Sequence, residues 1–157
     1  MTDKNVSIMN IGSMGYLPQV FKKIENEKKL NIVYLGGSIT MGCNATKTEL
    51  RYVDRSAKWW QTNFPDAEIS YFNAGIGATT SQFGVARVQE HVLDKQPDLV
   101  FVEFSVNDSS SPLFMETYES LVRRLLKAES SNAEQLTREL VATIAESPDF
   151  LDGFDAE

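Results

Sequence analysis

The sequence has almost none of the residues that metal sites and disulfides require. Its 157 residues include a single cysteine, Cys43, and a single histidine, His91. One cysteine excludes an internal disulfide and is typical of proteins from a reducing compartment, so we expect a cytoplasmic protein. One histidine and one cysteine also cannot assemble a Cys/His zinc site. The sequence therefore predicts no metal.

Basic charge and long apolar runs are scarce as well. The chain has 15 Lys and Arg against 22 Asp and Glu, which gives a formal net charge of −7, and no block of basic residues stands out. Such a chain is poorly suited to nucleic acid or to an anionic membrane surface. No apolar run approaches the roughly 18 residues of a membrane span. The N-terminal segment MTDKNVSIMN also lacks the basic and apolar parts of a signal peptide. We therefore expect partners that are neither nucleic acid nor membrane.

The chain does have the composition of an ordinary globular domain, with 42% hydrophobic and 24% charged residues. Three apolar segments are predicted as strands, at 30–35, 69–74 and 98–104, and three helical patterns alternate with them, at 51–64, 81–95 and 111–130. Within the first of these helices, Trp59 and Trp60 are expected to pack against the sheet. The alternation predicts an α/β fold with parallel strands in the spatial order 2-1-3 and helices on both faces.

Each predicted strand ends in a polar or glycine-rich segment. The first runs into GGSITMG, which presents Ser38 between glycines, the second runs into NAGIGATTS, and the third ends in SVND, which contains Asn107. Ligands of parallel sheets bind at the carboxyl ends of the strands. We therefore expect Ser38, the loop at 75–80 and Asn107 to form one site.

A glycine-lined turn that presents a hydroxyl suits a phosphate-binding loop or a nucleophile. The chain lacks both the Lys-Ser/Thr pair of a phosphate loop and a G-x-G-x-x-G segment after the first strand, so no nucleotide cofactor is expected. Acyl transfer fits better, because Ser38 supplies a hydroxyl while Asn107 and a backbone N–H of the second loop supply oxyanion donors. Two alternatives stay open at this point: Ser38 as a helix N-cap and Asn107 as a turn cap.

These three segments resemble those of the SGNH (GDSL-like) hydrolases, which are serine esterases and lipases with a flavodoxin-like, three-layer α/β/α fold. LGGSITMG is similar to the family's first block, FNAGIGATTSQFGVARV to its second and VEFSVND to its third, within a resemblance over about residues 5 to 130. The resemblance implies that Ser38 is the nucleophile. It also implies that the oxyanion donors are the backbone of Ser38, the backbone N–H of Ala78 and the amide of Asn107. The residues then expected to bind substrate are Gly37, Gly75, Gly77 and Thr80.

The resemblance implies small acyl esters as substrates, including acetyl groups on sugars, but it does not extend to the family's Asp-x-x-His block. That block supplies the general base, and no histidine follows His91. We therefore expect an SGNH-like domain over 1–130 that is truncated after its third strand. The segment 131–157 is expected to form an atypical amphipathic helix, at about 133–146, and an acidic tail. The prediction is an impaired serine esterase, and the alternative is a non-catalytic fragment or ligand-binding module of the same fold.

A sheet that stops at its third strand would leave the backbone groups of an apolar strand without partners. Natural proteins cover or charge such edges. We therefore expect self-association through this edge, or a second polypeptide that supplies the missing strands.

Overall fold

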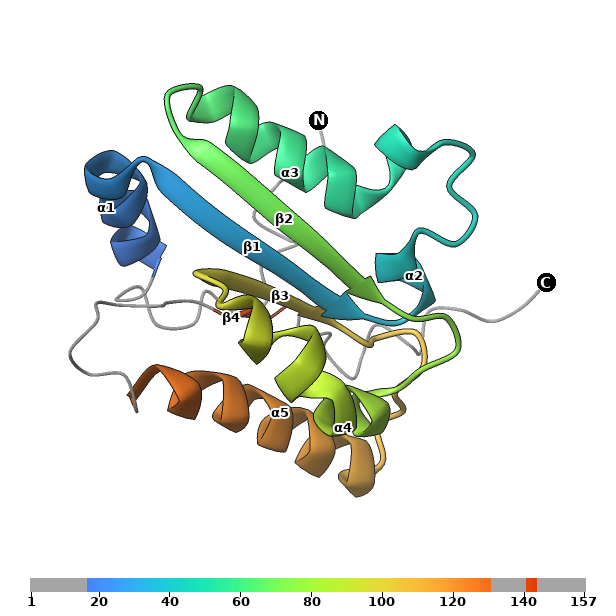
Figure 1. Ribbon diagram of the computed structural model, residues 1–157. Helices are drawn as coiled ribbons and strands as arrows, with labels where there is room; N and C mark the ends of the chain where they lie inside the picture. The colour runs from blue at the N-terminus through green and yellow to red at the C-terminus, as the bar shows by residue number, and fades with distance from the viewer. Residues whose placement is uncertain (1–16, 131–140, 144–157) are drawn as a thin grey trace, which may run out of the picture.

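The structure is a computed structural model that describes residues 17–130 and 141–143 (Figure 1). Its elements, in chain order, are α1 (Leu17–Glu27), β1 (Lys29–Gly36), α2 (Ser38–Met41), the 3₁₀ turn η2 (Thr48–Leu50), α3 (Tyr52–Asn63), β2 (Glu68–Gly75), α4 (Ser81–His91), the 3₁₀ turn η3 (Leu93–Lys95), β3 (Leu99–Glu103), α5 (Pro112–Ser130) and β4 (Val141–Thr143). The α/β class expected from the sequence is confirmed.

All four strands belong to one parallel sheet with the order β2-β1-β3-β4. β1 pairs with β2 over its whole length and ends with Gly36 opposite Gly75. On its other side β1 pairs with β3, where Gly36 lies opposite Glu103. The three predicted strands and their order 2-1-3 are therefore confirmed, and their carboxyl ends share one edge of the sheet.

The outer edge of β3 differs from the prediction. A fourth strand, Val141–Thr143, pairs in parallel with Val100, Phe101 and Val102 of β3. An amphipathic helix was expected there, but β-branched residues favour an extended strand that can pair with an open edge. The rest of the helix predicted at 133–146 lies outside the described residues. Pairing with β4 removes the structural reason for self-association at these three positions of β3.

The side chains of β1 alternate between two apolar layers, one on each face of the sheet. Tyr34 and its neighbours at alternate positions pack with α1 and α3, whereas Val33 and Leu35 pack with α4 and α5. Figure 1 shows α3 on one side of the sheet and α4 and α5 on the other. All residues from Ile32 to Leu35 are fully buried, as expected for a central parallel strand.

The two adjacent tryptophans of α3 have different surroundings. Trp60 is buried and packs against Phe21 of α1 and Phe64, with ring centroids 5.8 Å apart in both pairs. Trp59 is 52% exposed, so the prediction that it packs on the sheet is wrong. Successive residues of a helix point about 100° apart, and only one of the two can therefore face the sheet.

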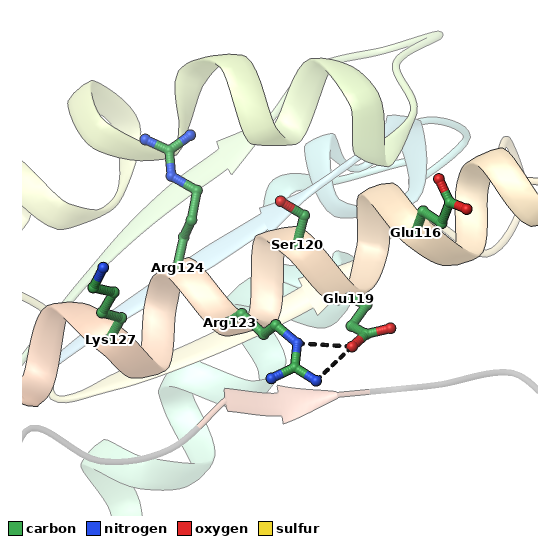
Figure 2. A pocket seen from close by; sticks show the side chains of 6 residues that line it. All are labelled: Glu116, Glu119, Ser120, Arg123, Arg124 and Lys127. Atoms are coloured by element: carbon green, nitrogen blue, oxygen red, sulfur yellow. Dashed lines mark hydrogen bonds and ion pairs between the residues drawn. The ribbon is translucent and has the colours of Figure 1, made fainter.

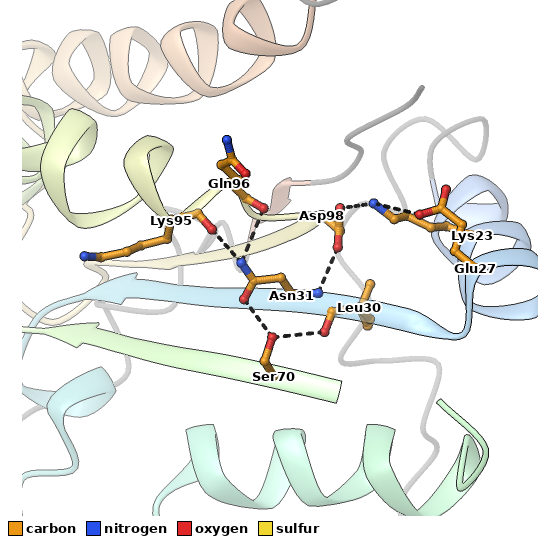
Figure 3. Close-up of polar contacts among 8 residues, drawn as sticks. All are labelled: Lys23, Glu27, Leu30, Asn31, Ser70, Lys95, Gln96 and Asp98. Carbon is orange, nitrogen blue, oxygen red and sulfur yellow. Dashed lines mark hydrogen bonds and ion pairs between the residues drawn. The ribbon is translucent and has the colours of Figure 1, made fainter. Parts of the chain in front are cut away.

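A polar cluster closes the edge of the sheet at which the strands begin (Figure 3). The buried carboxylate of Asp98 forms an ion pair with Lys23 of α1 and accepts a hydrogen bond of 2.8 Å from the backbone N–H of Asn31. The side chain of Asn31 donates to the carbonyl of Lys95 and accepts from the hydroxyl of Ser70. These contacts tie α1, β1, β2 and the start of β3 together, and the opposite edge carries the predicted site.

Candidate active site

Ser38 is the first residue of the short helix α2, directly after β1. The N-cap of α2 is Gly37, with φ −86° and ψ −146°, and no side chain caps this helix end. The carbonyl of Ser38 accepts hydrogen bonds from the backbone N–H groups of Gly42, at 3.0 Å, and Cys43, at 2.8 Å. The alternative in which the Ser38 side chain is the N-cap is therefore wrong. Ser38 is half-buried, and it follows a strand that is buried from Ile32 to Gly36.

Glycines allow α2 to lie directly against the ends of two strands. A Cβ atom at Gly36 would come within 2.0 Å of the Thr40 side-chain oxygen, and one at Gly75 within 2.1 Å of the backbone nitrogen of Met41. At Gly77 a Cβ atom would meet only the flexible end of the Met41 side chain, at 3.3 Å. Packing thus explains why residue 75 is a glycine, because the α2 backbone that a Cβ atom would meet there cannot move aside.

The loops after β1, β2 and β3 meet at Gly37. The side-chain amide of Asn107 donates to the carbonyl of Thr79 at 2.8 Å. A Cβ atom on Gly37 would lie 3.0 Å from that amide nitrogen and 3.2 Å from the carbonyl oxygen of Thr79. The backbone N–H of Gly37 also donates to the carbonyl of Glu103, at the end of β3. The structure therefore brings the residue before Ser38 against Asn107 and the second loop.

Two neighbouring side chains after β3 hold the second loop on either side of Thr80. Asn107 binds the carbonyl of Thr79, and Asp108 accepts a hydrogen bond of 2.9 Å from the backbone N–H of Ser81. Because Asn107 uses its side chain to reach a different loop, it does more than cap its own turn. An amide nitrogen has two hydrogens, and the bond to Thr79 uses one of them.

Ala78 adopts the left-handed backbone conformation, with φ +57°. Glycine reaches this region without a steric penalty, whereas other L-residues do so at a cost of about 1–2 kcal/mol. The loop that contains Ala78 is fixed by a hydrogen bond from the Ile76 N–H to the carbonyl of Gly36 and by one from the Thr79 hydroxyl to the carbonyl of Ile76. Ala78 thus adopts a conformation that glycine reaches more readily.

A buried polar network that sequence reasoning missed lies beside α2. The hydroxyl of Thr40 lies 2.9 Å from the phenol oxygen of Tyr52 and donates to the buried carboxylate of Glu103 at 3.3 Å. Burial raises the pKa of Tyr52 to about 12. A signal for this network was present in the sequence, because Glu103 is a charged residue inside the apolar strand segment DLVFVEF.

The only histidine of the chain does not serve Ser38 in this structure. The Nδ1 atom of His91, at the end of α4, lies 3.2 Å from a guanidinium nitrogen of Arg87. Within residues 17–130 no hydrogen bond joins His91 to Ser38. The described part of the chain therefore contains the serine and the candidate donors, but no imidazole bonded to that serine.

Other features of the described residues lie away from these loops. A hollow of about 350 Å³ lies along α5, between side chains that end in polar or charged groups (Figure 2). It is lined by Glu116, Glu119, Ser120, Arg123, Arg124 and Lys127. None of these residues belongs to the loops around Gly37. Among the described residues there is no cluster of three or more side chains suited to a metal ion, and no described helix is long and apolar enough to cross a membrane.

Comparison with known proteins identifies relatives of this chain. Its residues 34–153 match the GDSL-like Lipase/Acylhydrolase family. A solved two-domain esterase (CEX) active on acetylated mannans is 51% identical, with a TM-score of 0.64 over 68% of this chain and 30% of that one. The same esterase co-crystallized with mannopentaose gives 50% identity and a TM-score of 0.68, over 74% of this chain and 32% of that one. A lipase/acylhydrolase from Enterococcus faecalis is 27% identical, with a TM-score of 0.52 over 60% of this chain and 51% of that one.

This chain therefore spans about a third of the two-domain esterase and about half of the Enterococcus faecalis protein. No curated protein sequence matches it significantly. The family match covers more than half of the chain, and the two-domain esterase matches its fold over the aligned part. The chain belongs to the GDSL-like lipase/acylhydrolase family, as its three strand-end segments had indicated.

Proposed function

We propose that this chain carries the nucleophile and the oxyanion donors of a serine esterase site. Ser38 Oγ would bond to the acyl carbon of an ester, the bond to the alcohol oxygen would break, and that oxygen would take up the serine proton. The backbone N–H groups of Ser38 and Ala78 and the amide of Asn107 would hold the charge that develops on the carbonyl oxygen. The observation that carries this proposal is the meeting of Gly37, Asn107 and Thr79 immediately before Ser38.

The proposed substrates are small acyl esters, including acetyl groups on sugars. The esterase that is 50–51% identical is active on acetylated mannans, which supports this substrate class. We further propose that Gly37, Gly75, Gly77 and Thr80 line the substrate site, since small residues allow a ligand to approach the backbone closely.

We propose that hydrolysis by this chain alone is slow, because a general base for Ser38 is missing. His91 is the only histidine in the sequence, and it contacts Arg87. Loss of the base from a serine triad costs several orders of magnitude in rate, and binding together with the oxyanion hole retains a residual of about 10³–10⁴ over water. Full activity would need an imidazole or another general base placed at Ser38.

Hydrolysis of p-nitrophenyl acetate and labelling by a fluorophosphonate probe test this function. The expected result is slow, stoichiometric labelling that Ser38→Ala abolishes and Ser109→Ala leaves unchanged. Ser109 is a suitable control because it is an exposed serine in the loop after β3. Labelling that survives Ser38→Ala would refute the assignment of the nucleophile.

A ligand-binding module is the second candidate, and the contact of His91 with Arg87 favours it, because Ser38 then has no histidine partner within the described residues. Calorimetry with acetylated manno-oligosaccharides separates the two candidates. Binding that Asn107→Ala weakens, together with an unlabelled Ser38, would favour the binding module. We also propose a cytoplasmic location, which a lone, free and exposed Cys43 supports and which cell fractionation would test.

A further inference from the structure

Arg87 of α4 is a buried cation without a carboxylate partner among the described residues. It is 6% exposed, and burial lowers the pKa of its guanidinium. One terminal nitrogen donates to the carbonyl of Ala74 at 2.6 Å, and the other donates to the carbonyl of Gly36 at 3.0 Å. The ring of Phe83 lies 5.7 Å from the guanidinium carbon, and the Nε atom is buried without a hydrogen-bond partner. A buried charge is costly, so this arrangement calls for a reason.

Both acceptors of Arg87 lie at the carboxyl ends of strands. Gly36 is the last residue of β1 and precedes Gly37 and Ser38, whereas Ala74 is the penultimate residue of β2 and precedes the loop of Ala78. The carbonyl of Gly36 also accepts the backbone N–H of Ile76, which starts that loop. The same carbonyl therefore connects the guanidinium, the serine turn and the second loop.

The geometry of a guanidinium explains why an arginine suits this place. Its terminal nitrogens are coplanar and held at a fixed separation, so two carbonyls that bind them are held at a fixed separation too. A lysine ammonium carries the same charge on a single nitrogen at the end of a flexible chain. The structure thus contains a rigid fork across the ends of β1 and β2.

We propose that Arg87 is a positioning residue for the active site: it fixes the Ser38 turn relative to the Ala78 loop. The effect of Arg87 on catalysis rests on the proposed esterase function. The claim that Arg87 fixes the two loops relative to each other rests only on its hydrogen bonds to Gly36 and Ala74. Arg87 acts through these carbonyls and does not touch the reacting atoms.

Two variants and a matched control test the proposal. Arg87→Met removes the fork, and Arg87→Lys keeps the charge without it. Arg124→Met removes another arginine that donates to a backbone carbonyl: Arg124 is an exposed residue of α5, and its acceptor is the carbonyl of Val85 in α4. The measurements are the rate at which a fluorophosphonate probe labels Ser38 and residue-resolved amide hydrogen exchange.

The expected result is a local change. Arg87→Met should lower the labelling rate about tenfold or more, because misplacement by about an ångström has large effects on rate. Amide exchange at residues 37–43 and 76–79 should rise about tenfold, while α3 and α5 keep their protection. Arg87→Lys should fold and show the same local changes to a smaller extent. Arg124→Met should leave the labelling rate and the exchange of both loops unchanged.

Three outcomes would overturn the proposal. In the first, Arg87→Met raises amide exchange uniformly over the protein, which indicates a general core residue. In the second, Arg87→Met changes neither the labelling rate of Ser38 nor amide exchange. In the third, Arg87→Lys has the labelling rate and the exchange pattern of wild type. If Arg87→Met does not fold, the labelling rate and amide exchange of Arg87→Lys, compared with those of wild type, decide whether the proposal holds. If wild-type Ser38 is not labelled, the esterase function fails, and the exchange pattern still decides whether Arg87 fixes the two loops.

Discussion

Replacing Ala78 by glycine should stabilise the protein. Ala78 is exposed and has φ +57°, so its methyl group adds strain and no buried packing. The left-handed conformation costs a non-glycine residue about 1–2 kcal/mol. Glycine gives back about 0.4–1 kcal/mol of this, because its unfolded chain has more conformational freedom. The expected net gain is about 0.5–1 kcal/mol in the free energy of unfolding, or an increase of about 1–4 °C in Tm for a chain of this size.

Urea unfolding followed by circular dichroism, at equal protein concentration, measures this gain. The matched control is Ala86→Gly, at an exposed position inside α4, where the same substitution should cost about 1 kcal/mol. The two substitutions are chemically identical, and their effects should have opposite signs. If Ala78→Gly destabilises the protein as much as Ala86→Gly does, the argument from the backbone conformation is refuted.

Three further predictions concern the sheet edge and the titrating groups. Gly75→Ala should destabilise the protein by about 1–3 kcal/mol or displace α2, because its Cβ atom would lie 2.1 Å from the α2 backbone; a urea midpoint equal to that of wild type would contradict this. The hydrogen bond from Arg51 holds the pKa of Asp54 below its usual range. Asp54→Asn should therefore lower the free energy of unfolding at pH 7. The difference in this free energy between the variant and wild type should vanish as the pH falls through the native pKa of Asp54, and urea unfolding at a series of acidic pH values would measure it. Burial raises the pKa of Tyr34 and Tyr52 to about 12. These phenols therefore favour folding below about pH 10, and that contribution is lost as the pH rises toward 12, so absorbance at alkaline pH should show their late ionisation together with falling stability.

The strands were predictable because their sequence signals are local. LNIVYL has apolar residues on both faces, with Asn31 as the exception, and this pattern is typical of a central parallel strand. The positions of Ser38 and Asn107 followed from the same signal, since each residue lies within four residues of the end of a strand. Their catalytic roles stay predictions, because the packing that brings Asn107 to Gly37 does not itself test them.

Features that depend on distant contacts were not predictable. In SQFGVARVQEH, Arg87 has the appearance of an ordinary helix arginine, and it is buried only because α4 crosses the ends of β1 and β2. The three residues of β4 fall within a longer sequence segment whose apolar residues also have helical spacing, and the open edge of β3 decides their conformation. The left-handed turn at Ala78 is likewise imposed by the contacts of its loop.

The difference between the two layers also determines what spectroscopy can detect in this molecule. Trp59 and Trp60 are the only tryptophans, and both belong to α3. Trp60 contacts α1 and Phe64, whereas the layer of α4 and α5 contains no tryptophan. Intrinsic fluorescence therefore reports directly on one face of the sheet. Loosening of α5 alone would change the circular dichroism and leave the emission of Trp60 nearly constant, so a difference between the two signals would identify which layer opens first.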